Sequence, residues 1–273
     1  MAYRSLFIPA LDAGSLAGAV ADAGVMLGDG PGVIRAHFVV DDYRPPVSMA
    51  DAVNLNQIVE AQRTLARRLE KELHTAFDDA AAKLPGNVQC TFRSAEGEMP
   101  RAAALASRLC EAILYRHRGA KKKAFDPMLI EELLFRSGRP LVLVPPSGLR
   151  ARPDVLAVAW NGSAEATRAV ALAQPLLRQA KKIFVVTIGR EQTGTPSAED
   201  MAAHFNDCGT EAEVLRGQPG GSDGKMLADI AIEAGAKMMV LGAYSRSRLR
   251  EVILGGVTKS YLEEPPLPLL IAR

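Results

Sequence analysis

The stretch of sequence that decides the fold lies near the C-terminus and reads Met238-Met-Val-Leu-Gly-Ala-Tyr-Ser-Arg-Ser-Arg-Leu-Arg-Glu-Val-Ile-Leu-Gly-Gly-Val-Thr258. Its first four residues form an apolar run typical of a buried strand, Gly242 turns the chain, and Gly255 and Gly256 open a predicted helix after a basic loop. A strand, a glycine loop and a helix N-terminus together present backbone N–H groups to an anion. The stretch therefore predicts a phosphate-binding edge of an α/β sheet.

The C-terminal half of the chain repeats this strand–helix unit. Its strands are rich in apolar and β-branched residues, as buried parallel strands are. Predicted strands are 155–159, 183–187, 212–215, 238–241 and 268–272, and predicted helices are 165–179, 197–208, 225–234 and the segment after Gly255. Strands that alternate with helices indicate a parallel sheet covered by helices.

The N-terminal half follows the same plan, so we expect two domains, 1–147 and 153–273, joined by a proline-rich linker. Leu65, Leu69, Leu73 and Phe77 recur every four residues, which predicts a helix face packed on the core, or alternatively a helix-pair interface. The predicted strands are 6–9, 33–40, 88–93, 112–115 and 141–144, and the predicted helices are 15–27, 50–84, 101–109 and one that contains 131–135.

The composition is typical of a globular protein with enough apolar residues to form hydrophobic cores. Of 273 residues, 48% are hydrophobic and 23% charged, and the net charge of +2 arises from interleaved basic and acidic residues. This balance favours neither nucleic acid nor an anionic membrane as a partner, and no apolar run approaches the roughly 20 residues of a membrane span. The chain enters a predicted strand at once, so we expect no leader and a cytoplasmic location. Three scattered cysteines predict small buried thiols in a reducing compartment, and neither they nor the four histidines predict a metal site.

Across nearly its whole length the chain resembles a tandem universal stress protein, two such domains fused in one polypeptide. The resemblance is carried by Val158-Ala-Trp-Asn-Gly-Ser163, by the stretch Leu241–Thr258, by the proline-flanked last strand, and in the first half by 131–145. It implies two five-stranded, doubly wound, Rossmann-like α/β domains of strand order 3-2-1-4-5. The last strands of the two halves, 141–144 and 267–272, would pair within the chain as a pseudo-dimer, because long apolar sheet edges favour pairing.

In that family a loop with the spacing Gly, two residues, Gly, nine residues, Gly and Ser or Thr holds a nucleotide. This chain keeps the spacing, with Ser245 at the second glycine and Gly256 at the hydroxyl position, while Asn161 stands for an acidic residue near the adenine and ribose. The resemblance implies ATP or a related adenine nucleotide in the C-terminal domain. The implied nucleotide-binding residues are Asn161, Gly162, Ser163, Thr187, Gly242, Ser245, Arg246, Ser247, Gly255, Gly256, Val257 and Thr258.

These residues also have structural interpretations. Asn161 or Ser163 is a natural helix cap, the glycines serve turn geometry, and Trp160 is expected to pack in the core rather than stack on a base. The alternating arginines that follow Ser245 are typical of a solvated surface.

In the N-terminal domain the loop is degenerate. Arg136 precedes Ser137 where the family has a glycine, and there is no spaced glycine series after the fourth strand. Asp12 could take the acidic role, and the run Lys121–Lys123 could hold an anion, although a solvated loop is the more ordinary interpretation. This domain is therefore expected to be a structural copy.

Two functions remain open from the sequence. The first is a stress-response protein that binds a nucleotide in its C-terminal domain and acts through conformation or protein partners, either as a single chain or as a further homodimer. The alternative is a scaffold of the same fold that binds no nucleotide. An enzyme is not expected, because no Ser or Cys is paired with a His, and no Walker lysine or carboxylate cluster for Mg²⁺ is present.

Overall fold

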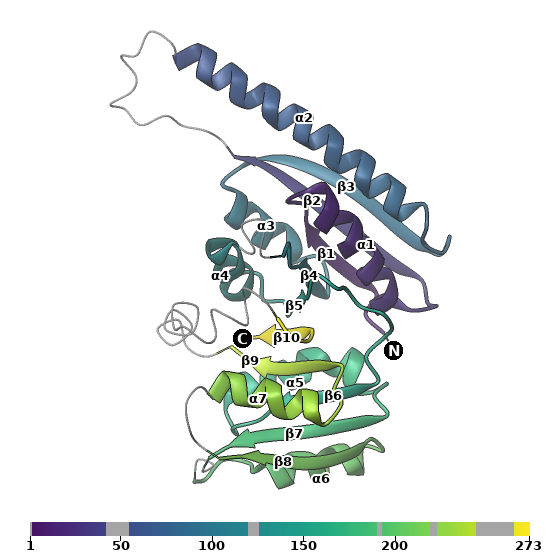
Figure 1. Cartoon of the computed structure of the whole chain (residues 1–273), viewed down its shortest axis with the longest axis vertical. Coiled ribbons are helices and arrows are strands. Elements are labelled where there is room, and N and C mark those ends of the chain that lie inside the picture. Colours follow the sequence, from purple (N-terminus) through teal and green to yellow (C-terminus); the bar gives the residue numbers. More distant parts are fainter. Residues whose placement is uncertain (1, 42–54, 120–125, 190–192, 219–222, 244–264) are drawn as a thin grey trace.

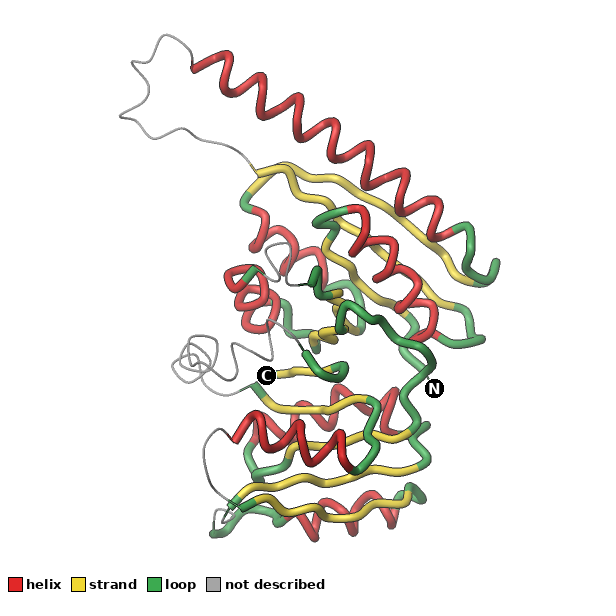
Figure 2. The backbone as a smooth tube through the Cα atoms, in the orientation of Figure 1, coloured by secondary structure: helices red, strands yellow, loops and turns green. Residues whose placement is uncertain are grey.

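The computed structural model describes residues 2–41, 55–119, 126–189, 193–218, 223–243 and 265–273. The predicted helix after Gly255 and the run Lys121–Lys123 lie outside these residues. Helices and strands alternate in both halves of the chain (Figures 1 and 2). The described strands are β1 (Ser5–Pro9), β2 (Gly32–Asp41), β3 (Val88–Gly97), β4 (Ala112–Arg116), β5 (Leu141–Val144), β6 (Val155–Ala159), β7 (Lys182–Ile188), β8 (Glu211–Gly217), β9 (Met238–Gly242) and β10 (Leu269–Ala272). The described helices are α1 (Ala13–Leu27), α2 (Leu55–Ala81), α3 (Met99–Ser107), α4 (Pro127–Arg136), α5 (Ala164–Leu177), α6 (Ala198–Asp207) and α7 (Asp223–Glu233).

All ten strands form one sheet in the order β3-β2-β1-β4-β5-β10-β9-β6-β7-β8. Each half has the predicted parallel order 3-2-1-4-5, and the halves meet where β5 pairs antiparallel with β10. In that pair Leu270 lies opposite Val142, and Leu269 lies opposite Leu143. The predicted pairing of the two terminal strands is confirmed, and it turns two sheet edges into the middle of one sheet. The domain limits at 147 and 153 stay a prediction.

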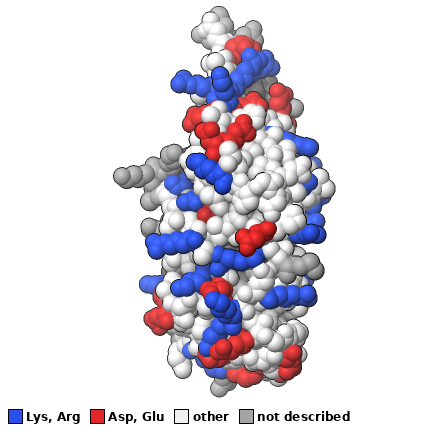
Figure 3. Space-filling view, turned by 90° about the vertical axis from the view of Figure 1, so that its right-hand side faces the viewer, with Lys and Arg blue, Asp and Glu red and all other residues white. Residues whose placement is uncertain are grey.

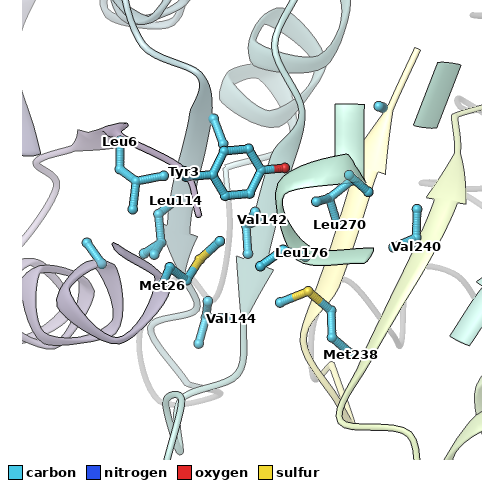
Figure 4. Packing of buried hydrophobic residues seen from close by; sticks show 14 of the residues in the cluster. Tyr3, Leu6, Met26, Leu114, Val142, Val144, Leu176, Met238, Val240 and Leu270 are labelled. Atoms are coloured by element: carbon cyan, nitrogen blue, oxygen red, sulfur yellow. The ribbon is translucent and has the colours of Figure 1, made fainter. Parts of the chain in front are cut away.

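The hydrophobic core is continuous across this junction. One core lies between the sheet and the helices α1, α2, α5 and α6, and the other lies under α3, α4 and α7. Figure 4 shows the first core at the junction, where Val142 and Leu270 face each other with Leu176 beside them. Both strand residues have no exposed surface. Burying apolar side chains is the main force in folding, at roughly 25 cal/mol per Å², so the core itself holds the halves together.

Two polar contacts add to this junction. The Tyr3 hydroxyl donates to the Leu172 carbonyl of α5 over 2.7 Å. Arg152 in the linker donates from Nη2 to the Met26 carbonyl at the end of α1 (3.0 Å) and from Nη1 to Gln179 Oε1 (2.5 Å). The Tyr3 contact joins the two halves directly, and Arg152 ties the end of α1 to the turn that follows α5.

The long helix differs from the prediction along half its length. Leu73 and Phe77 are buried and Leu69 is partly buried, whereas Leu65 is 61% exposed. Figure 1 shows that α2 runs along β2 and β3 with its N-terminal end standing away from the strands. The apolar stripe is therefore a core face only in its C-terminal half. Nearer its N-terminus the helix stands off the ends of β2 and β3 and leaves a groove of about 380 Å³, lined by Leu65 on one side and by Phe38 and Val40 on the other.

The sequence also predicted how charges are distributed on the surface and how far the cysteines are buried. In Figure 3, basic and acidic side chains are interspersed over the face in view. Cys110 is buried and Cys90 half-buried, but Cys208 is exposed, which corrects the expectation that all three are buried. No helix in the described part of the chain is long and apolar enough to cross a membrane.

Candidate functional site

The candidate site lies at the carboxyl ends of β6 and β9. These strands are parallel neighbours, with Val158 opposite Val240. The helix that follows β6 packs on the first core, whereas α7, which precedes β9, packs on the second. The chain therefore changes faces between these two strands, and such a switch point opens a crevice outside the carboxyl ends of a doubly wound sheet. The sequence placed its two strongest motifs at these strand ends, and the structure brings their described parts together.

A pocket of about 100 Å³ occupies this position. Its wall combines apolar side chains with two polar ones and the start of α5. Typical small-molecule pockets measure roughly 300–1,000 Å³, so the described residues would contact only part of a nucleotide. The described residues that line it are Ala159, Trp160, Asn161, Ser163, Ala166, Ile188, Leu227, Leu241 and Gly242.

The N-terminus of α5 forms one wall of the pocket. Ser163 is the N-cap of this helix, and its Oγ accepts a hydrogen bond from the Ala166 N–H over 3.2 Å. Asn161 Oδ1 accepts from the Ser163 N–H over 3.1 Å, which closes a tight turn ahead of the helix. Ser163, and not Asn161, therefore caps α5. The helix dipole still favours an anion here, although side-chain oxygens already take two of the backbone N–H groups.

Two of the predicted glycines are required by close backbone contacts. A Cβ on Gly242 would lie 2.6 Å from the Ala166 nitrogen and 2.6 Å from the Glu165 carbonyl carbon. Gly162 has a φ of +72°, which side chains rarely adopt, and a Cβ there would clash with the Thr195 side chain and lie 3.0 Å from the Pro196 carbonyl oxygen. Because real Cβ atoms do not approach this closely, both positions need glycine for packing.

The neighbouring Trp160 is packed, as the sequence predicted. Its side chain is 3% exposed, and its indole N–H donates to the Pro196 carbonyl over 3.0 Å. Thr187 is also buried, and it lies next to Ile188 on β7. Side chains alternate along a strand, so Thr187 faces the first core while Ile188 faces the pocket. Only its backbone would be available to a ligand.

The remaining predicted residues, Ser245, Arg246, Ser247, Gly255, Gly256, Val257 and Thr258, lie outside the described residues. Sequence reasoning did not assign the side chains of Ile188, Leu227 and Leu241 to the site. Ile188 and Leu241 sit at the ends of predicted strands, and that position is the signal that could have identified them.

In the first half of the chain, the long side chain of Arg116 stands at the strand end that corresponds to Gly242 in the candidate site. Arg116 is the last residue of β4, as Gly242 is the last of β9. Its Nη1 lies 2.7 Å from Asp22 Oδ2 on α1, and its Nη2 donates to the Pro146 carbonyl over 2.8 Å. A Cβ on Gly18 of α1 would lie 2.5 Å from the Arg116 guanidinium carbon, so the arginine lies directly against the helix.

Asp22 completes this buried network. Its Oδ1 accepts the Leu149 N–H from the linker over 2.7 Å, and its side chain is 3% exposed. Burial raises the pKa of Asp22 above its ordinary value, although the Leu149 N–H and the Arg116 charge oppose this shift. The network ties β4, α1 and the linker together.

Two helix N-termini of the first half, those of α1 and α4, are closed by carboxylates. Asp12 caps α1, with Oδ1 accepting the Ser15 N–H over 3.0 Å, and Asp126 Oδ1 accepts from Met128 N and Leu129 N at the start of α4. A carboxylate that occupies these N–H groups repels a phosphate from the same position.

One prediction about this half is wrong. The sequence placed Arg136 and Ser137 where a phosphate would meet a helix start, but Arg136 is the last residue of α4 and Ser137 is its C-cap. The motif was matched to the wrong end of the helix, because the helix already begins at Pro127, directly after the Asp126 cap.

Comparisons with known proteins agree with this fold. Residues 209–273 match the model of the Universal stress protein family. The structure is similar to a universal stress protein from Archaeoglobus fulgidus, with a TM-score of 0.70 and 17% identity over 98% of each chain. A putative universal stress protein from Pseudomonas aeruginosa gives a TM-score of 0.53 and 15% identity, covering 99% of this chain and 93% of that one.

A protein of unknown function from Pseudomonas aeruginosa gives a TM-score of 0.55 and 15% identity, covering 99% of this chain and 92% of that one. No curated protein matches the chain. Identities this low establish the fold, and the family model adds a match in sequence over the C-terminal segment. The chain therefore has the fold of universal stress proteins in both halves, and its residues 209–273 match the sequence pattern of that family.

Proposed function

We propose that this protein binds ATP or a related adenine nucleotide in its C-terminal half and acts in a stress response through its conformation or its protein partners. The observation that carries the proposal is the pocket at the switch point between β6 and β9, with the start of α5 as one wall. Apolar groups such as Ile188, Leu227 and Leu241 suit the face of a base, and a helix N-terminus favours phosphate. The cytoplasmic location expected from the sequence belongs to this proposal.

Binding rather than catalysis is proposed for this site. The described residues that line the pocket include no His, Cys, Asp, Glu, Lys or Arg. The Ser163 hydroxyl accepts a hydrogen bond from the backbone of α5, which is a capping role. A serine nucleophile needs an adjacent general base, and none lines this part of the pocket.

The test uses the single tryptophan of the chain. Trp160 lines the pocket, so its fluorescence should change when ATP is titrated into the purified full chain, and the change should saturate. Titration calorimetry of the same samples should give a matching Kd. An ATP titration that leaves both the fluorescence and the heat unchanged would contradict the proposal and favour the scaffold.

A variant pair separates the pocket from general effects on the fold. Leu227→Arg places a guanidinium in a pocket of about 100 Å³ and should abolish the saturable signal. Ile232→Arg makes the same change on the same helix, at a side chain that is 42% exposed, and should bind as the wild type does. Circular dichroism of both variants should match the wild type. Equal binding by both variants would place the nucleotide elsewhere.

A further inference from the structure

A patch of arginines around two exposed leucines lies on the first half of the chain, away from the pocket. Leu109 is 78% exposed and Leu105 is 46% exposed, both unusual for large apolar side chains. Leu109 follows Arg108, the C-cap of α3, in the turn that leads to β4. The Leu109 patch consists of these two leucines with Arg35, Arg101, Arg108 and Arg139.

Three of the four guanidinium groups of this patch, those of Arg35, Arg108 and Arg139, are held in place by backbone carbonyls. Arg108 donates from Nε (3.1 Å) and Nη2 (2.8 Å) to the Arg136 carbonyl at the end of α4. Arg139 donates from Nε (3.2 Å) and Nη2 (2.8 Å) to the Arg108 carbonyl, and Arg35 donates to the Leu109 carbonyl over 3.0 Å. The carbonyls orient the arginines without neutralising their charge.

Within the described residues, Arg35, Arg108 and Arg139 form no ion pair with a carboxylate. The carboxylate beside the turn, Glu111, accepts from the backbone N–H groups of Arg4 and Ser5. A guanidinium has five N–H donors, so Arg108 and Arg139 each retain donors for a bidentate bond to a carboxylate. The patch therefore carries an excess of fixed positive charge around an apolar centre.

We propose that the Leu109 patch is a docking surface for an acidic protein segment that carries an apolar side chain. Its charge is complementary to Asp and Glu, and Leu109 and Leu105 provide an apolar contact at the centre. Arginine is enriched at the energetic centre of protein interfaces, whereas lysine is depleted, and this patch contains arginine alone. These arginines could also pair with phosphate groups, but a phosphate partner would leave Leu109 and Leu105 in water.

The Leu109 patch is arranged to hold a bound protein segment in one orientation. Arg101, Leu105 and Arg108 lie four and then three residues apart, which places them along one face of α3. Because the charged groups of Arg108 and Arg139 are already anchored, little side-chain entropy is lost when a carboxylate binds.

The experiment is a selection of random peptides on the immobilised full chain, followed by affinity measurement of the recovered peptides. We expect sequences rich in Asp and Glu with an apolar residue. Leu109→Ser should weaken their binding by about tenfold or more, because an exposed anchor is removed from the centre of the contact. Leu65→Ser, which changes a leucine that is 61% exposed on α2, should leave the affinity unchanged.

Charge is tested separately. Arg101 has an exposed side chain, and Arg101→Gln should lower the affinity for the selected peptides without lowering the stability of the protein. Raising the salt concentration should also lower the affinity, because salt screens the attraction between the arginines and the acidic peptides. Peptides without an acidic pattern, or acidic peptides bound equally by Leu109→Ser, would overturn the proposal. Tighter binding of a short DNA duplex than of any selected peptide, unaffected by Leu109→Ser, would also overturn it and assign the patch to phosphate.

Discussion

Gly242 and Ala166 are in backbone contact, since a Cβ on Gly242 would lie 2.6 Å from the Ala166 nitrogen. The glycine ends β9, and Ala166 lies in the first turn of α5, so the contact fixes the start of the helix against the strand. The same glycine belongs to the motif from which the sequence predicted a nucleotide loop. Gly242 therefore has two roles that arise from the same contact: it lets β9 pack against the start of α5, and it forms part of the pocket wall.

We expect Gly242→Ala to push α5 away from β9. The added methyl group should lower the free energy of unfolding by about 1–3 kcal/mol, the usual cost of overpacking, and should weaken any nucleotide bound at the pocket. Urea unfolding and ATP titration would measure both effects. Gly30→Ala is the matched control, because a Cβ there meets nothing within 4 Å. Wild-type stability of Gly242→Ala would show that the contact is not constraining.

The junction of the two halves is tested at Leu270. The side chain has no exposed surface and lies opposite Val142 in the antiparallel pair, so Leu270→Lys buries an unpaired ammonium group. We expect a loss of about 3 kcal/mol or more in urea unfolding, together with aggregation in size-exclusion chromatography. Leu65→Lys, at an exposed leucine, should change the stability by less than about 0.5 kcal/mol. Similar stability of the two variants would argue against the continuous sheet.

The buried pair of the first half is tested by a double-mutant cycle. Asp22→Ala leaves the Arg116 guanidinium with the Pro146 carbonyl alone, and the Leu149 N–H loses its acceptor. Removing one partner of a buried pair typically costs about 3–5 kcal/mol. Arg116→Met in the Asp22→Ala background should cost much less than in the wild type, because the two side chains act as a unit. Additive losses in urea unfolding would mean that they act independently.

The titration of His37 should make the stability of the fold depend on pH. Burial, with a smaller effect of the Arg93 charge, lowers the pKa of His37 below 6.5. The unfolded chain then takes up a proton at higher pH than the folded chain, so stability should fall as pH drops through 6.5 toward the lower folded pKa. His37→Gln should flatten that fall in urea unfolding measured across this range. An unchanged pH profile in the variant would contradict the assignment.

Much of the fold was predictable because it depends on local patterns. The predicted strands 141–144 and 155–159 match β5 and β6 to the residue, since each is a short apolar run with clear borders. The pairing of β5 with β10 was implied by the resemblance to two fused universal stress protein domains, and the apolar character of both terminal strands supported it.

The parts that were missed depend on contacts between distant residues. The exposure of Leu65 could not be read from its four-residue spacing, because it depends on how far α2 stands from the ends of β2 and β3. Arg116 and Asp22 are 94 residues apart, and no periodicity links them. In the candidate site, Ser163 and Gly242 were predicted from their own motifs, whereas Trp160 was predicted only to pack in the core, and the contribution of Leu227 required the packing of α7.

The central claim is that the C-terminal half holds an adenine nucleotide. The most direct test is mass spectrometry of the small molecules released when gently purified full-length protein is denatured. We predict close to one ATP, ADP or AMP per chain, reduced to background in Leu227→Arg and retained in Ile232→Arg. A chain that releases no nucleotide and gives no heat when titrated with ATP would contradict the claim.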